Sequence, residues 1–106
     1  MTGNLLVAYC EGVTPDLIFR ALGDPTRAAI VDELRERDDQ ALFELCTRLI
    51  TKRDIAVSRQ AVSKHLALLV EAGVVEAVRD GRTTRHRLQP AALDTARAWL
   101  AGEEPS

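Results

Sequence analysis

The sequence predicts a mainly α-helical domain that carries one small β-hairpin. Three pairs, Thr14-Pro15, Asp24-Pro25 and Gln89-Pro90, each place a cap-like residue before proline, the preferred first residue of a helix. Apolar residues recur at helical spacing through the middle of the chain. Further on, the spacing becomes that of extended strands, interrupted by Asp80-Gly81, a typical hairpin turn. At 106 residues, the chain is expected to form one domain, residues 1–106, with a modest core.

Local signals delimit the first three helices. The first is expected from Pro15 to about Leu22, and the second from Pro25 to about Glu36. The third is expected from about Ala41 to Lys52, and Lys52–Val57 forms the turn that follows it. Its apolar series is Leu42, Leu45, Cys46, Leu49 and Ile50. Residues 1–13 are ambiguous between a strand and the first turn of an arm.

A fourth helix is predicted over Ser58–Gly73, because Ser58 can cap its start and Gly73 can stop it. The expected buried stripe consists of Val62, Leu66, Leu69 and Val70. The opposite arc contains Arg59, Gln60, Ser63, Lys64, Ala67 and Glu71. Near the N-terminus this arc is short, polar and partly cationic, so it could enter a DNA major groove. The helix alone leaves an ordinary amphipathic surface helix as the alternative.

The strands of the expected hairpin are Val74–Val78 and Thr83–Leu88. Four arginines cluster around its turn: Arg79, Arg82, Arg85 and Arg87. A final helix begins at Pro90 and carries the apolar residues Leu93, Ala96, Trp99 and Leu100. The predicted order is therefore three helices, a turn, a fourth helix, a basic hairpin and a last helix.

Charge and composition restrict the functional classes. The net charge of −2 argues against nucleic-acid binding, but residues 58–88 carry six basic and three acidic side chains, a local charge of +3. Two cysteines form no disulfide framework, which favours a reducing cytoplasm. The apolar run Leu5–Tyr9 is too short for a signal peptide or a membrane span. We expect no enzyme, because no phosphate loop, paired catalytic carboxylates or nucleophile–His–Asp arrangement is found.

The predicted order is that of a winged helix-turn-helix, in which a recognition helix follows a supporting helix and an arginine-bearing hairpin forms the wing. Three motifs carry a resemblance to the ArsR/SmtB family of bacterial transcriptional regulators: LGDPTR at Leu22–Arg27, SRQAVSKHLALLVEAGVV at Ser58–Val75, and DGR at Asp80–Arg82. The resemblance covers roughly residues 15–100. It implies a homodimer, formed by N- and C-terminal segments, that binds double-stranded DNA at an inverted repeat.

The resemblance also implies individual DNA contacts. Gln60 and Ser63 match base-facing positions of the family, and Arg59 and Lys64 match phosphate contacts. The expected wing contacts are Arg82, Arg79 and Arg85. Each of these side chains has the alternative of serving only as solvated surface.

The family's usual metal-ligand sets are incomplete in this chain. The resemblance places a two-cysteine site on the supporting helix, but here the run is Glu44-Leu45-Cys46-Thr47-Arg48, with arginine for the second cysteine. A cation there should repel a metal ion. A second family site on the last helix retains only Asp94. No cofactor is therefore expected, although an atypical metal site, with Cys46 and Cys10 as weak candidates, stays open.

The remaining candidates have mainly structural interpretations. Cys46 lies on an apolar stripe and is expected in the core, and both His65 and His86 are expected to be structural. The leading hypothesis is a DNA-binding regulator whose effector is a small molecule, an atypical metal, a redox change at Cys10 and Cys46, or a sensor partner protein. The rival hypothesis is a winged-helix module that docks a protein instead of DNA. Repression versus activation and the operator sequence are left undetermined.

Overall fold

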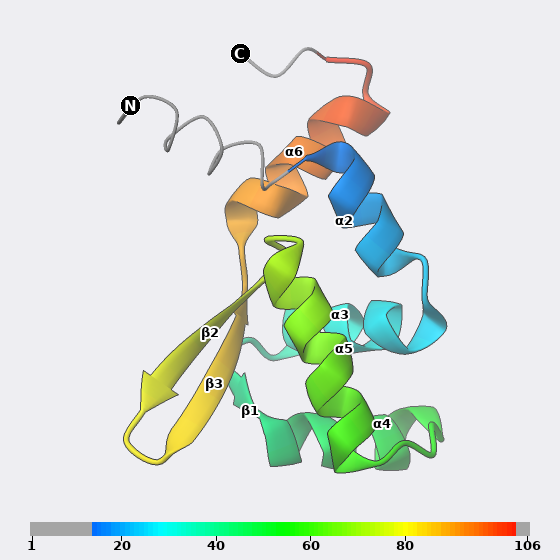
Figure 1. Cartoon of the computed structure of the whole chain (residues 1–106). Helices are drawn as coiled ribbons and strands as arrows, with labels where there is room; N and C mark the ends of the chain where they lie inside the picture. The colour runs from blue at the N-terminus through cyan, green and yellow to red at the C-terminus, as the bar shows by residue number, and fades with distance from the viewer. Residues whose placement is uncertain (1–13, 104–106) are drawn as a thin grey trace.

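The computed structural model describes residues 14–103, which form five helices and a small antiparallel sheet (Figure 1). The elements are α2 (Pro15–Leu22), α3 (Pro25–Glu36), β1 (Gln40–Ala41), α4 (Leu42–Arg53), α5 (Arg59–Glu71), β2 (Val75–Asp80), β3 (Thr83–Leu88) and α6 (Pro90–Leu100). This order confirms the predicted winged helix-turn-helix. The expectations for residues 1–13, including Cys10, lie outside the described residues.

Side-chain caps fix three of the predicted helix starts, whereas Gln89, the cap-like residue before Pro90, makes no side-chain capping hydrogen bond. The hydroxyl of Thr14 accepts from the N–H of Leu17 at 3.2 Å, and the Asp24 carboxylate accepts from Arg27 N–H at 3.0 Å. Ser58 likewise accepts from Ala61 N–H at 3.1 Å, so α5 begins where its cap predicted. Across residues 14–103, no helix has the length and apolar character needed to cross a membrane.

The third helix ends one residue later than predicted. Arg53 is still helical, and Asp54 then adopts a left-handed conformation with φ of 55°. Asparagine and glycine are the residues usually associated with such a C-terminal position, so aspartate gave only a weak sequence signal for the stop.

The sheet has the strand order β1-β3-β2. The hairpin of β2 and β3 projects from the helical body in Figure 1, and Gly81 in its turn has φ of 67°. The short strand β1 was not predicted. It pairs Gln40 with His86 and Ala41 with Arg85, and thereby attaches the hairpin to the connection between α3 and α4.

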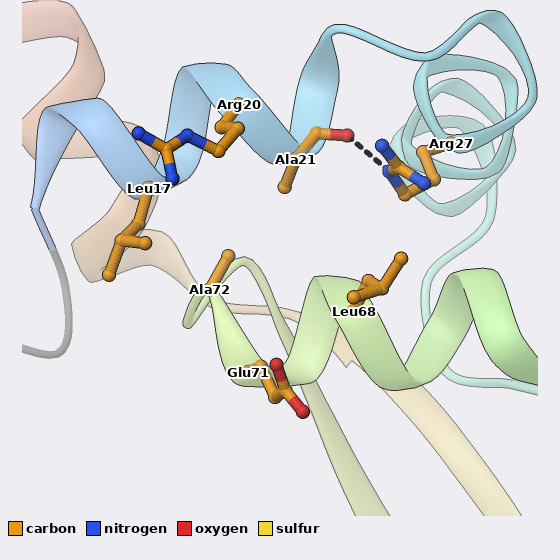
Figure 2. Close-up of a pocket in the computed structure, with 7 residues that line it drawn as sticks. All are labelled: Leu17, Arg20, Ala21, Arg27, Leu68, Glu71 and Ala72. Carbon is orange, nitrogen blue, oxygen red and sulfur yellow. Dashed lines mark hydrogen bonds between the residues drawn. The ribbon is translucent and has the colours of Figure 1, made fainter.

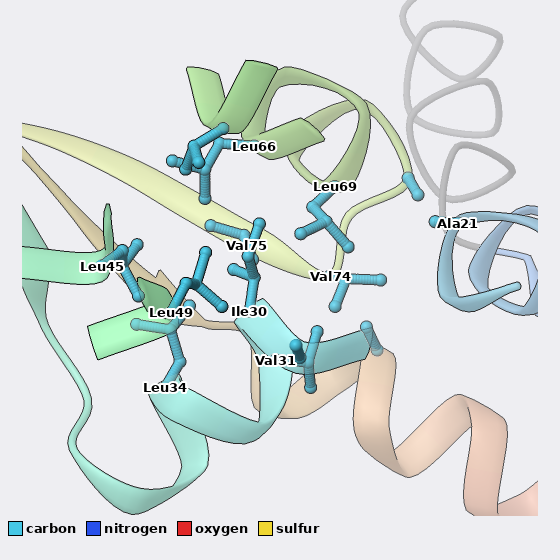
Figure 3. Packing of buried hydrophobic residues seen from close by; sticks show 14 of the residues in the cluster. Ala21, Ile30, Val31, Leu34, Leu45, Leu49, Leu66, Leu69, Val74 and Val75 are labelled. Atoms are coloured by element: carbon cyan, nitrogen blue, oxygen red, sulfur yellow. The ribbon is translucent and has the colours of Figure 1, made fainter. Parts of the chain in front are cut away.

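The core lies where α3, α4 and α5 meet the base of the sheet (Figure 3). Its most buried side chains include Ile30, Leu34, Leu45, Leu49 and Leu69. These residues confirm most of the predicted apolar faces.

Some apolar positions differ from the prediction. Val70, expected on the buried stripe of α5, is 38% exposed, and Ile50 of α4 is 50% exposed. On α5, a step of roughly 100° per residue carries Val70 away from Val62 and towards the polar face. At the C-terminal end of α6, Trp99 and Leu100 also lie largely in solvent.

Candidate nucleic-acid interface

Helix α5 is held by one face and exposed on the other. Val62, Leu66 and Leu69 are at most 3% exposed and pack into the core. The four predicted contact residues of the N-terminal half are all exposed: Arg59, Gln60, Ser63 and Lys64. Their exposure leaves a polar edge available to a partner, while the apolar face fixes the orientation of that edge.

The LGDPTR segment positions α5 through Arg27, a role that the sequence did not reveal. Arg27 Nε donates to the carbonyl oxygen of Ala21 at 2.6 Å, and a terminal guanidinium nitrogen of Arg27 donates to His65 Nδ1 at 3.2 Å. His65 belongs to α5, and its Nδ1 also lies 3.8 Å from the Asp24 carboxylate. The segment therefore joins the end of α2, the start of α3 and the middle of α5. His65 is structural here, as predicted.

The four hairpin arginines divide into two pairs. Arg79 and Arg82 are exposed and form no salt bridge within residues 14–103. By contrast, Arg85 donates to the carbonyl oxygen of Asp39 at 2.6 Å and lies 3.2 Å from its carboxylate. Arg87 Nε donates to the same carboxylate at 3.0 Å. The structure therefore brings Arg85, a predicted wing contact, into the attachment of β3 to the segment before β1.

The wing strand β3 is fixed further by buried polar contacts. His86 is 7% exposed, and its Nδ1 lies 3.1 Å from the carbonyl oxygen of Gln40. Burial lowers the pKa of His86, which keeps the imidazole neutral at pH 7. The Gln40 amide in turn donates to the carbonyl oxygens of Glu33 and Arg37. His86 is thus structural, as predicted.

Salt-bridge pairing separates the cations of the chain into two groups. Nine of the 14 lysines and arginines form salt bridges. Considering only residues 14–103, the cations without a salt bridge are Arg27, Arg59, Lys64, Arg79 and Arg82. All of these except Arg27 are predicted DNA contacts. An exposed cation without a salt bridge can bind a phosphate at little cost in free energy, because no existing ion pair has to be broken.

The position expected to repel a metal ion holds part of a buried ion cluster. Glu33 of α3 is fully buried, and its carboxylate accepts from Arg48 Nε at 2.6 Å and from Arg53 Nε at 2.5 Å. Lys52 lies 3.7 Å away. Burial alone would raise the pKa of Glu33, but the hydrogen bonds from Arg53 and Arg48 hold it below the ordinary value. Arg48 therefore connects α4 to α3.

Metal ligands do not gather elsewhere in the part of the chain that the structure describes. Among residues 14–103, no group of three or more His, Cys, Asp or Glu side chains is placed to hold a metal ion. Cys46 is 7% exposed and packs in the core, as predicted, and burial raises the pKa of its thiol. Asp94 of α6 lies 3.6 Å from Arg97 in an exposed pair.

Comparisons with known proteins agree with this geometry. Residues 22–78 match a family model described as a helix-turn-helix domain. An uncharacterised HTH-type transcriptional regulator of Bacillus subtilis is 54% identical over 67 residues, which cover 63% of this chain and 73% of that protein. An ArsR-like transcriptional regulator from Rhodococcus sp. RHA1 has a similar structure, with a TM-score of 0.69, 39% identity and coverage of 90% and 80% of the two chains.

A further solved structure comes from Mycobacterium bovis and is described as a homodimeric winged helix-turn-helix DNA-binding domain. Its TM-score is 0.63 at 25% identity, covering 91% of this chain and 79% of that one.

Proposed function

Because this chain belongs to the ArsR/SmtB family of winged helix-turn-helix transcriptional regulators, we propose that it binds an inverted-repeat operator as a homodimer. Gln60 and Ser63 read base edges in the major groove, while Arg59 and Lys64 hold the adjacent phosphates. Arg79 and Arg82 contact the flanking backbone. The proposed location is the cytoplasm, where the DNA lies.

The distribution of unpaired cations carries this proposal. Within residues 14–103, the cations with no salt bridge are Arg27 and four of the five cationic residues predicted to contact DNA, namely Arg59, Lys64, Arg79 and Arg82. The other arginines and the other lysine form salt bridges with Asp and Glu. The chain can therefore have a net negative charge while the cations at the N-terminal end of α5 stay unpaired. Arg85 is not among the proposed phosphate contacts, because Asp39 engages both its charge and its hydrogen-bond donors.

The proposed dimer uses the exposed apolar surface of α2 and α6. The rings of Phe19 and Trp99 pack with centroids 5.2 Å apart, yet Trp99 is 58% exposed and Leu100 is 69% exposed. Exposed apolar side chains of this size often mark a protein interface. Binding to two half-sites requires that a two-fold axis there places the two copies of α5 about 34–36 Å apart, one turn of DNA.

We propose that metal at the family's usual positions is not the signal. Arg48 stands at the position of the second cysteine of the family's two-cysteine site, and it donates a hydrogen bond to the buried Glu33 carboxylate. Asp94, the residue retained from the second family site, lies beside Arg97. The sources of regulation that stay open are a small molecule, a sensor protein that binds the dimer, a metal at an atypical site, and a redox change at Cys10 and Cys46.

The test is a fluorescence anisotropy titration on the chain's own promoter and on random DNA, at several salt concentrations. Gln60→Ala should lose about tenfold in preference for the operator, because a bidentate base contact discriminates by about 1–3 kcal/mol. Arg82→Ala should weaken both DNAs alike and flatten the logarithmic salt slope by about 1, for one lost phosphate contact.

The matched control is Arg35→Ala, which removes the same charge from an exposed arginine already paired with Asp32 on α3. It should leave the salt slope unchanged. Equal affinity for operator and random DNA, with no salt dependence in the wild type, would refute DNA reading and favour the protein-docking alternative.

A further inference from the structure

A cavity of about 510 Å³ opens between α2, α3 and α5, beneath the LGDPTR segment (Figure 2). The lining side chains are Leu17, Arg20, Ala21, Arg27, Leu68, Glu71 and Ala72. As Figure 2 shows, α2 forms one wall, α5 forms the opposite wall, and Arg27 lies at the end next to α3. The volume falls in the range of about 300–1,000 Å³ that is usual for small-molecule sites.

The walls of this cavity are mainly apolar. Four of its lining residues, Leu17, Ala21, Leu68 and Ala72, have apolar side chains, and Leu68 is 46% exposed although it is a large aliphatic side chain. An apolar tail bound here would remove that surface from water. The cavity therefore favours a ligand with an aliphatic or aromatic body.

The positive charge of Arg27 indicates what kind of group the ligand carries at the end opposite its apolar tail. It is half-buried and forms no salt bridge within residues 14–103. Its Nε and one terminal nitrogen are used by Ala21 and His65, while the second terminal nitrogen donates to no group among the same residues. A guanidinium presents five N–H donors and prefers a carboxylate as its partner.

The two other charged residues at the cavity are more exposed. Arg20 is paired with Asp16 at 3.0 Å on the outer face of α2, and Glu71 lies exposed on α5. They form the rim, where water screens their charges. The half-buried cation thus determines the preferred sign of the ligand, which is negative.

We propose that this cavity is an effector site for a small carboxylic acid with an apolar tail. The carboxylate pairs with Arg27, and the tail lies between Leu17 and Leu68. Because Arg27 also donates to His65 of α5, a bound carboxylate alters the link that positions the recognition helix. Effector and operator binding are therefore coupled, each changing the affinity for the other by the same factor. This regulatory part rests on the proposed function, whereas the binding site itself does not.

The first experiment is isothermal titration calorimetry of the full chain with octanoate, with 1-octanol and octylamine as controls that share its tail. Octanoate should bind once per chain, and the two controls should bind at least about tenfold more weakly, because a hydrogen-bonded ion pair is lost. In the series butanoate, hexanoate and octanoate, affinity should rise about fourfold for each buried methylene. Binding of none of the three acids, or equal binding of octanoate and octanol, overturns the site.

Variants assign the binding to this cavity. Arg27→Gln should weaken octanoate about tenfold, whereas Arg35→Gln, on the same helix but away from the cavity, should not change it. Leu68→Trp should also weaken octanoate by filling the space, and it keeps Arg27 in place if the first variant fails to fold. Wild-type affinity in Leu68→Trp, measured in a folded sample, overturns the assignment.

Operator affinity is measured on the same samples with and without octanoate. A change of operator affinity that is absent in Arg27→Gln supports the regulatory proposal, and an unchanged operator affinity overturns it. Octanoate binding without any DNA binding would leave the site standing and refute the proposed function. DNA binding without octanoate binding would support the proposed function and refute the effector site.

Discussion

At the scale of single residues, a charged side chain that forms a salt bridge is engaged within the chain itself, whereas one without a salt bridge is available to a partner. Glu33 lies in the C-terminal half of α3, with its carboxylate fully buried and hydrogen-bonded to Arg48 and Arg53. Removing one member of a buried ion pair is costly, because the charges left behind have lost their partner. The two arginines remain about a quarter exposed, so water can partly replace Glu33.

We predict that Glu33→Gln lowers the free energy of unfolding at pH 7 by about 2–3 kcal/mol, measured by urea denaturation. Since the folded pKa of Glu33 is below its ordinary value of 4.5, its contribution is complete above about pH 4.5 and is lost as pH falls through the folded pKa. The difference between variant and wild type should therefore shrink on acidification.

The control is Glu36→Gln, a change in the same cluster at a half-exposed carboxylate, which should alter stability little. A difference between Glu33→Gln and wild type that stays constant down to strongly acidic pH would contradict the ion-pair origin of the effect.

At the scale of secondary-structure elements, the wing is attached by its second strand. Asp39 precedes β1 with φ of 64° and receives Arg85 and Arg87 of β3 on one carboxylate. The neighbouring Asp38 accepts instead from the backbone N–H of Leu88 at 3.0 Å. Asp39 thus holds both arginines in salt bridges, whereas Asp38 forms no salt bridge with either of them among residues 14–103.

We predict that Asp39→Asn raises affinity for random DNA and makes the logarithmic salt slope steeper, by about 1 for each arginine that gains a phosphate. Asparagine tolerates the left-handed backbone, so the turn should survive. The measurement is anisotropy against salt, with Asp38→Asn as a control that removes the same charge one residue away. If the two variants gave the same slope, Arg85 and Arg87 would not be restrained as described.

Elements that depend on residues close together in the sequence could be predicted, whereas those that depend on distant residues could not. The Pro-marked helix starts and the Asp80-Gly81 turn depend on neighbours in the sequence, so they could be predicted. Strand β1 has two residues, too few to show a period, and it exists because β3 pairs with it from far along the chain. Its pairing is a tertiary effect.

The same distinction applies to the candidate site. The exposure of Arg59–Lys64 follows from helical periodicity, which is local. In contrast, Arg82 and Arg85 look alike in the sequence, and only the fold brings Asp39 to one of them. The role of Arg27 was missed for the same reason, because His65 lies on a different helix.

At the scale of the whole molecule, the proposed function requires two copies of α5 in a fixed relation. The surface available for dimerisation within residues 14–103 includes Leu100, which is 69% exposed at the end of α6, beside the packed rings of Phe19 and Trp99. Because Leu100 contributes little to the fold of one chain, a charge at this position should affect association more than folding.

We predict that Leu100→Asp yields a folded monomer in sedimentation equilibrium and loses most operator affinity, since one half-site then binds alone. Phe43→Asp is the matched control: this side chain is 61% exposed but lies on α4, away from α6. It should sediment like the wild type. Should Leu100→Asp also sediment like the wild type while Phe43→Asp dissociates, the dimer would use α4, and the two recognition helices would not be arranged by α2 and α6.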